Sequence, residues 1–129
     1  MTTSREAYVL VVDDDPLILG LISARLEGAG YNVTTAADAW QEILQAQGLK
    51  IGLVITDINM PGAGTGLDAY KHLRGVFPQL PVIFVSAMSP AEIAKQLPSD
   101  PRVRVLPKPI DFARLRAMIK ELTGVDRPL

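Results

Sequence analysis

Residues that can take part in phosphate chemistry follow four short apolar runs of this 129-residue chain. Most of them are carboxylates, one is a hydroxyl and one is an ammonium group. Carboxylates are ligands that Mg²⁺ takes in proteins, and a cation beside a carboxylate can position a phosphoryl group and neutralise its charge. The runs and the residues after them are 8–12 with Asp13, Asp14 and Asp15, 53–56 with Asp57, 82–85 with Ser86, and 103–107 with Lys108.

Asp13 and Asp14 are interpreted as ligands of a divalent cation. If Asp57 lies beside them, two like charges about 4 Å apart repel by roughly 4 kcal/mol at an effective dielectric constant of about 20, and a bound cation relieves that repulsion. The alternative is that the acids only cap the following helix and interact with its positive end. One cap does not need three acids, so we assign capping to Asp15 and metal binding to the other two.

Asp57 is the candidate nucleophile, because a carboxylate can attack phosphorus and form an acyl phosphate. Ser86 could donate a hydrogen bond to a phosphoryl oxygen, and Lys108 could neutralise its charge. Taken alone, Asp57 is better explained as an ordinary strand-end residue in a turn, and Ser86 is explained equally well as a turn residue. The interpretation therefore depends on all four strand ends meeting. Lys108 stands between Pro107 and Pro109, and the bond between Lys108 and Pro109 is a candidate cis peptide.

The apolar runs are short and continuous, which is typical of strands covered on both faces of a parallel sheet. A weaker fifth strand is expected at 31–35. Five helices alternate with the strands, and this alternation predicts right-handed crossovers and a doubly wound α/β sheet. Ligands bind outside the carboxyl ends of such strands, so the four polar endings should converge. The first expected helix starts after Asp15 and ends at Gly28 or Gly30, and the second and third cover 38–47 and 66–76. The fourth runs from Pro90 to before Pro98, and the fifth starts at Asp111 and ends before Gly124.

Composition and charge favour one domain over residues 1–129, with a core at about 6–123. The net charge of −1 gives no general attraction to nucleic acid. No apolar run approaches the ~20 residues that span a bilayer, and the polar amino terminus lacks the apolar core of a signal peptide. These features predict a cytoplasmic protein with no membrane insertion. The chain has no cysteine, which excludes disulfides and thiolate metal sites.

Four segments together resemble the receiver domain of two-component response regulators: 11–16, 56–62, 85–87 and 106–109. The resemblance covers about residues 6–123 and implies a flavodoxin-like fold with strand order 2-1-3-4-5. It implies that Asp57 accepts a phosphoryl group from a phosphohistidine on a sensor histidine kinase or a histidine phosphotransfer protein. It also implies that Asp13, Asp14, Asp57 and the backbone carbonyl of Asn59 hold Mg²⁺, and that Ser86 and Lys108 contact the phosphoryl oxygens.

The resemblance further implies a signalling module in a phosphorelay or two-component system, which catalyses only its own phosphorylation and dephosphorylation. No output domain follows Leu122, so the sequence predicts a stand-alone receiver that reaches a downstream protein target through protein contacts, without direct nucleic-acid binding. A phosphorylation-dependent homodimer stays open.

Three segments depart from the family pattern, and all three bear on signal output. Val105 stands where the family usually has an aromatic residue. The stretch 97–102 replaces a Gly-Ala turn, which predicts a short or irregular fourth helix. The loop between Pro61 and Gly66 is one residue longer than usual.

Two other functions remain as alternatives. The first is a degenerate receiver that binds partners without phosphorylation; the complete set of site residues argues against it and Val105 argues for it. The second, more remote, is a haloacid-dehalogenase-like phosphatase, suggested by Asp13 and Asp15 after an apolar run with later Ser86 and Lys108. That class needs a further acidic pair after the lysine, and it leaves Asp57 unexplained.

Overall fold

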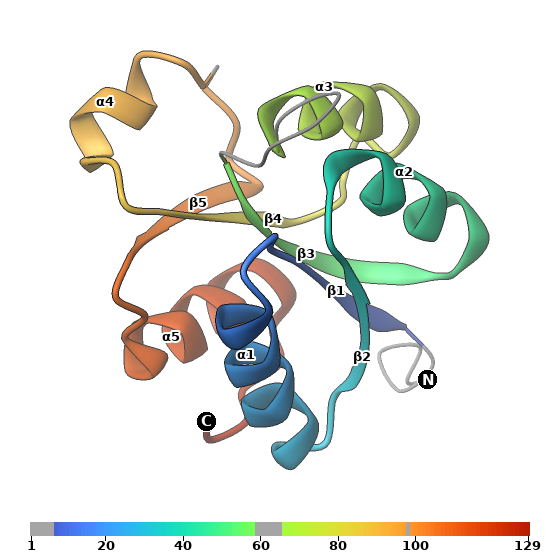
Figure 1. The fold of residues 1–129 in the computed structure, drawn as a ribbon, viewed down its shortest axis with the longest axis vertical. Coiled ribbons are helices and arrows are strands. Elements are labelled where there is room, and N and C mark those ends of the chain that lie inside the picture. Colours follow the sequence, from blue (N-terminus) through green and yellow to red (C-terminus); the bar gives the residue numbers. More distant parts are fainter. Residues whose placement is uncertain (1–6, 59–65, 98) are drawn as a thin grey trace.

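The computed structural model describes residues 7–58, 66–97 and 99–129. Its centre is a five-stranded parallel sheet with strand order β2-β1-β3-β4-β5, as the sequence predicted (Figure 1). Two expectations fall outside the described residues: the carbonyl of Asn59 and the length of the loop that starts at Pro61. The strands are β1 (Tyr8–Val12), β2 (Asn32–Ala36), β3 (Ile51–Asp57), β4 (Val82–Ser86) and β5 (Val103–Pro107).

Helices cover both faces of the sheet, which confirms the predicted doubly wound architecture. Figure 1 shows α1 and α5 on one face and α2, α3 and α4 on the other. Within the described residues, none of these helices has the length and apolarity to cross a bilayer. The helices are α1 (Pro16–Gly28), α2 (Ala39–Gly48), α3 (Gly66–Val76), α4 (Pro90–Ala94) and α5 (Phe112–Thr123).

The helix boundaries follow from their capping residues. The Asp15 side chain accepts the N–H of Leu17 at 2.9 Å, and Pro16 occupies the first helical position of α1, where a missing N–H costs nothing. Asp111 caps α5 in the same way. Gly124 ends α5 with φ of 79°, a left-handed conformation that favours glycine. The predicted starts of both helices are therefore confirmed.

One strand is longer than expected, and the fourth helix is as short as the sequence predicted. β3 starts at Ile51 rather than Leu53, because Ile51 pairs with Tyr8 of β1 across a register irregularity. α4 ends at Ala94, well before Pro98, and the chain continues through a turn in which the N–H of Gln96 donates to the carbonyl of Ile93. The predicted short fourth helix is confirmed.

The sheet separates the core into two clusters. Alternate residues of each strand point to opposite faces: Val54 and Phe84 belong to the cluster under α2 and α3, and Ile55 and Ile83 belong to the cluster under α1 and α5. Val105, which stands at the position of the family's aromatic residue, packs against the first cluster. Apolar packing on both faces fixes the central strands and therefore the positions of the polar residues at their ends.

Candidate functional site

The strand order brings the four predicted polar endings to one edge of the sheet. β1, β3, β4 and β5 are consecutive neighbours. Asp13 follows β1, Asp57 ends β3, Ser86 ends β4, and Lys108 follows β5. In the register, Asp57 lies opposite Val85 and Ser86 lies opposite Pro107, so these residues stand within one or two residues of the same level along the sheet.

Three carboxylates gather at this edge. Asp13, Asp14 and Asp57 each present an oxygen, and these oxygens lie within 4.8 Å of one another. Asp13 is 2% exposed and Asp57 is 8% exposed, whereas Asp14 is exposed to solvent. A cluster of oxygen ligands that is buried on one side and open to water on the other fits Mg²⁺, which binds few carboxylates and keeps several waters.

Lys108 joins two of the three carboxylates. Its Nζ lies 3.2 Å from Oδ2 of Asp57 and 3.3 Å from Oδ2 of Asp13. Burial acts to lower the pKa of Lys108, but the hydrogen bond and charge of Asp57, with a smaller effect of Asp13, raise this pKa above its usual value. The main chain fixes the position of Lys108, because its N–H donates to the carbonyl of Ser86 at 2.9 Å. The following bond to Pro109 is cis, as predicted.

Asp13 is held by its own turn. Its Oδ1 accepts the N–H of Asp15 at 2.9 Å, which directs the other oxygen toward Lys108. Burial raises the pKa of Asp13, and the Asp15 N–H and the Lys108 charge counter part of that shift. Asp15 itself turns away to cap α1, so the predicted separation of roles among the three consecutive acids agrees with the geometry.

Ser86 lies at the same edge and is 1% exposed. Its Oγ accepts the N–H of Met88 at 3.0 Å, which orients the side chain in the turn after β4. The sequence predicted that this hydroxyl contacts a phosphoryl oxygen, and this role stays a prediction.

Sequence reasoning missed Gly66, which packs against the main chain of Asp57. Its N–H donates to the carbonyl of Ile58 at 3.1 Å, and a Cβ at this position would collide with the carbonyl oxygen of Asp57. The absence of a side chain therefore lets the start of α3 pack directly on the main chain of the candidate nucleophile.

Sequence reasoning also missed Glu42 and Thr56. Glu42 lies on α2 and is 1% exposed, and its Oε1 accepts the Thr56 hydroxyl at 2.9 Å. Burial raises the pKa of Glu42 to about 8, against a smaller opposing effect of this hydrogen bond. A sequence signal existed: Ala39 and Ala46, three residues before and four after, belong to the core, so Glu42 falls on a buried helical face.

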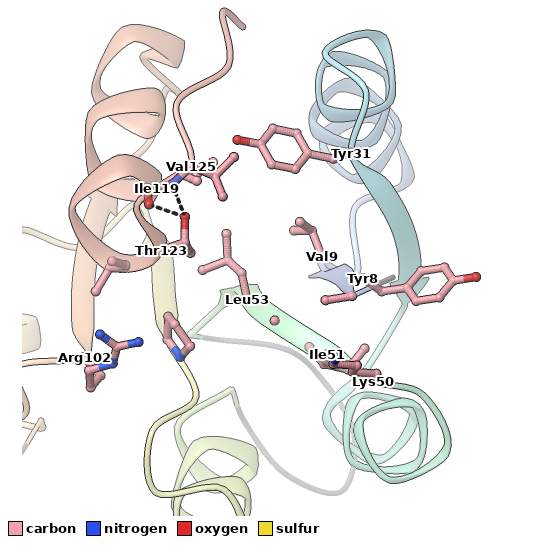
Figure 2. A pocket seen from close by; sticks show the side chains of 14 residues that line it. Tyr8, Val9, Tyr31, Lys50, Ile51, Leu53, Arg102, Ile119, Thr123 and Val125 are labelled. Carbon is pink, nitrogen blue, oxygen red and sulfur yellow. Dashed lines mark hydrogen bonds between the residues drawn. The ribbon is translucent and has the colours of Figure 1, made fainter. Parts of the chain in front are cut away.

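A separate cavity of about 310 Å³ lies at the amino-terminal ends of β1 and β3, opposite the acidic edge (Figure 2). Val9, Leu53 and Ile119 form apolar walls, and Tyr31, Lys50 and Arg102 also line it. Among the described residues, Asp13, Asp14, Asp57, Ser86 and Lys108 do not border this cavity.

Comparisons with known proteins match the chain to one family. The pattern of the response regulator receiver domain matches residues 9–120. The chain is 33% identical over 116 residues to the sensor kinase CckA of Brucella abortus, covering 88% of this chain and 12% of that protein. It is 32% identical over 113 residues to the transcriptional regulatory protein ZraR of Escherichia coli K12, covering 88% of this chain and 25% of that protein.

A solved structure gives the same result. The chemotaxis protein CheY4 of Vibrio cholerae superposes with a TM-score of 0.78 at 30% identity, covering 90% of this chain and 98% of that one. The two curated relatives are much longer than this chain, which spans an eighth to a quarter of their length.

Proposed function

The chain belongs to the response regulator receiver domain family of two-component signalling, and on that premise we propose that Asp57 is its phosphoacceptor. The observation that supports this proposal most directly is the placement of Asp57, which is buried among Asp13, Asp14 and Lys108 at the carboxyl edge of the sheet. We further propose a receiver domain that signals through protein contacts.

The proposed reaction is phosphoryl transfer from a phosphohistidine. A carboxylate oxygen of Asp57 attacks phosphorus and forms a P–O bond, while the P–N bond breaks and its electron pair stays on the imidazole nitrogen. Lys108 balances the negative charge that arrives on Asp57, and the Ser86 hydroxyl donates to a phosphoryl oxygen. Later hydrolysis of the acyl phosphate by water returns the carboxylate.

Asp13, Asp14 and Asp57 are the residues proposed to hold Mg²⁺, with the Asn59 carbonyl as the fourth protein ligand. The bound ion supplies positive charge for the phosphoryl oxygens. The reason to expect it is electrostatic: three carboxylates face one ammonium group at this edge.

The proposed phosphodonor is a sensor histidine kinase or a histidine phosphotransfer protein in the cytoplasm. α1 begins directly beside the acidic cluster, and it exposes Leu17 and Leu21, which are 82% and 48% accessible. Exposed apolar side chains next to a reactive group suit a protein partner that must bring its phosphohistidine to Asp57. The relatives include a sensor kinase and a transcriptional regulatory protein, so membership in this family does not identify the downstream protein target.

Intact mass after incubation with acetyl phosphate and Mg²⁺ tests the proposal, with Asp57→Ala measured beside the wild type. We expect the wild type to gain one phosphoryl group and the variant to gain none, with circular dichroism as the control for folding. A folded wild type that gains no phosphoryl group favours the degenerate binding module. Catalytic consumption of acetyl phosphate that persists in Asp57→Ala favours the phosphatase.

A further inference from the structure

Two buried polar residues next to the phosphoacceptor have no place in the proposed reaction. Thr56 directly precedes Asp57 and is 0% exposed, and Glu42 reaches it from α2. The second carboxyl oxygen of Glu42, Oε2, is buried and has no hydrogen-bond partner among the residues that the structure describes. A carboxyl group left half satisfied in a core lowers stability, which suggests a role beyond packing.

The Thr56 hydroxyl faces two acceptors. Its Oγ1 lies 2.9 Å from Oε1 of Glu42 and 3.2 Å from the carbonyl oxygen of Asp57. A hydroxyl has one proton to donate and two lone pairs to accept with. If Glu42 is ionised, the Thr56 proton is drawn to Oε1. If Glu42 carries a proton, its own O–H can donate to Oγ1, and the Thr56 proton is released to the Asp57 carbonyl.

We propose that Glu42 is a positioning residue for the phosphoacceptor and acts through the Thr56 hydroxyl on the main chain of Asp57. This inference rests on the proposed function of Asp57. The peptide group between Asp57 and Ile58 is held at both ends, because the N–H of Ile58 donates to the carbonyl of Val85 at 3.3 Å while the carbonyl of Asp57 faces Thr56. A change in the Thr56 hydrogen bond alters one of these two restraints.

The direction of the effect follows from charge. Phosphorylation adds negative charge at Asp57. Glu42 contacts Thr56, the residue before Asp57, so an ionised Glu42 opposes that added charge in a low-dielectric core. A neutral Glu42 therefore favours the phosphorylated state and strengthens the hydrogen bond to the Asp57 carbonyl. The expected change in the rate of phosphoryl loss is about twofold to tenfold, the range of a single net hydrogen bond.

No charged side chain accounts for the state of Glu42. α2 packs against β1, β2 and α3, and the shift in the pKa of Glu42 comes from burial and from Thr56. The titratable and charged groups on the described residues of those elements, and of β3, whose Thr56 bonds Glu42, are Tyr8 on β1, Asp57 on β3, and Asp68, Tyr70, Lys71, His72 and Arg74 on α3.

The test follows two quantities from about pH 6 to about pH 10, which is roughly two units on either side of the Glu42 pKa of about 8. One is the ¹³C chemical shift of the Asp57 carbonyl in the unphosphorylated protein, and the other is the rate at which phosphorylated Asp57 loses its phosphoryl group. In the wild type we expect both to change with one inflection near pH 8. In Glu42→Gln we expect both profiles to be flat through this range.

Thr56→Val tests the route, and Glu121→Gln is the matched control. Thr56→Val keeps the shape of the side chain and removes the hydroxyl, so the carbonyl shift should no longer follow Glu42. Glu121 is exposed on α5 and pairs with Arg104, so its variant should keep the wild-type profiles. Either inflection surviving unchanged in Glu42→Gln, or the inflection of the carbonyl shift surviving unchanged in Thr56→Val, overturns the proposal.

The carbonyl shift keeps this proposal separate from the proposed function. If wild-type Asp57 takes no phosphoryl group, the proposed function fails, and a flat carbonyl shift then overturns the positioning role as well. If Asp57 is phosphorylated but the carbonyl shift and the rate show no inflection, only the role of Glu42 falls. If the carbonyl shift follows pH in an unphosphorylatable wild type, the contact is supported and Glu42 positions Asp57 for another purpose.

Discussion

Two groups of buried carboxyls lie on opposite faces of β3 and differ in how their charge is compensated. At the carboxyl edge, Asp13 and Asp57 share the ammonium of Lys108, with Asp14 nearby in solvent. On the other face, the hydroxyl of Thr56 is the hydrogen-bond partner that Glu42 has within residues 7–58, 66–97 and 99–129. A cation next to a carboxylate favours its charged form, whereas burial with a neutral partner favours the protonated form.

This difference in charge compensation indicates what the acidic edge and the buried Glu42 can each do. A charged cluster that is open to water on one side can bind a cation and take part in group transfer. A carboxyl closed in a core can only change the hydrogen bonds around it as it gains or loses a proton. The first region suits chemistry and the second suits adjustment of that chemistry.

Of the variants considered, Glu42→Gln should change the pH dependence of the free energy of unfolding most. Between its ordinary pKa of 4.5 and about 8, Glu42 is protonated in the folded protein and ionised in the unfolded chain. Its contribution to stability is therefore complete below pH 4.5 and is lost as the pH rises to about 8. Wild type should lose on the order of 4 kcal/mol across that range relative to the variant.

Urea unfolding of both proteins at a series of pH values measures this difference. Glu121→Gln, the same change at an exposed position, should follow the wild type. Parallel curves for wild type and Glu42→Gln would show that Glu42 is ionised in the fold and would remove the contrast between the two regions.

Lys108→Ala should slow phosphorylation of Asp57 by acetyl phosphate about 100-fold, because it removes the positive charge that faces the incoming phosphoryl oxygens. The rate is measured by intact mass over time at fixed Mg²⁺. Lys71→Ala, an exposed position on α3, is the control. A decrease of less than about threefold in the phosphorylation rate, in a variant that stays folded, would mean that the Lys108 ammonium group is not needed for the reaction.

Gly66→Ala should destabilise the protein by about 2 kcal/mol, since the added methyl group meets the carbonyl oxygen of Asp57 and the backbone there must shift. Gly75→Ala in the same helix is the matched control, because its Cβ would meet nothing within 4 Å. That variant should gain about 0.5–1 kcal/mol from helix propensity. Equal stability of the two variants in thermal unfolding would show that α3 can move away from Asp57.

Mg²⁺ should raise the melting temperature of the wild type, because it binds the folded acidic edge and not the unfolded chain. At about ten times its Kd the ion stabilises by roughly 1.4 kcal/mol. Asp14→Asn should lose most of this shift, and in chelator it should be about 0.5 kcal/mol more stable than wild type because one repelling charge is gone. A variant that is less stable in chelator would make Asp14 a structural residue.

The sequence by itself determined the elements, the sheet and the composition of the acidic edge. Continuous apolar runs predict buried parallel strands, Asp15 with Pro16 and Asp111 predict helix starts, and the motifs after the strands predict which side chains meet at the carboxyl ends. These signals are local, because a cap or an apolar run acts within a few residues. The longer β3 was missed because Gly52 breaks the apolar pattern, and Ile51 joins the strand only by pairing with Tyr8 of β1 across the register shift.

Only the tertiary structure decided the contacts between elements distant in the chain. Lys108 could have faced solvent; its bonds to Asp57 and Asp13 depend on the order of β1, β3, β4 and β5. In the sequence, Glu42 resembles an ordinary polar helix residue. Only the fold places it in the core, where it bonds the hydroxyl of Thr56 on β3. Burial and pairing across 14 or 51 residues arise from the packing of the whole domain, and this packing raises the pKa of the buried Glu42 carboxyl.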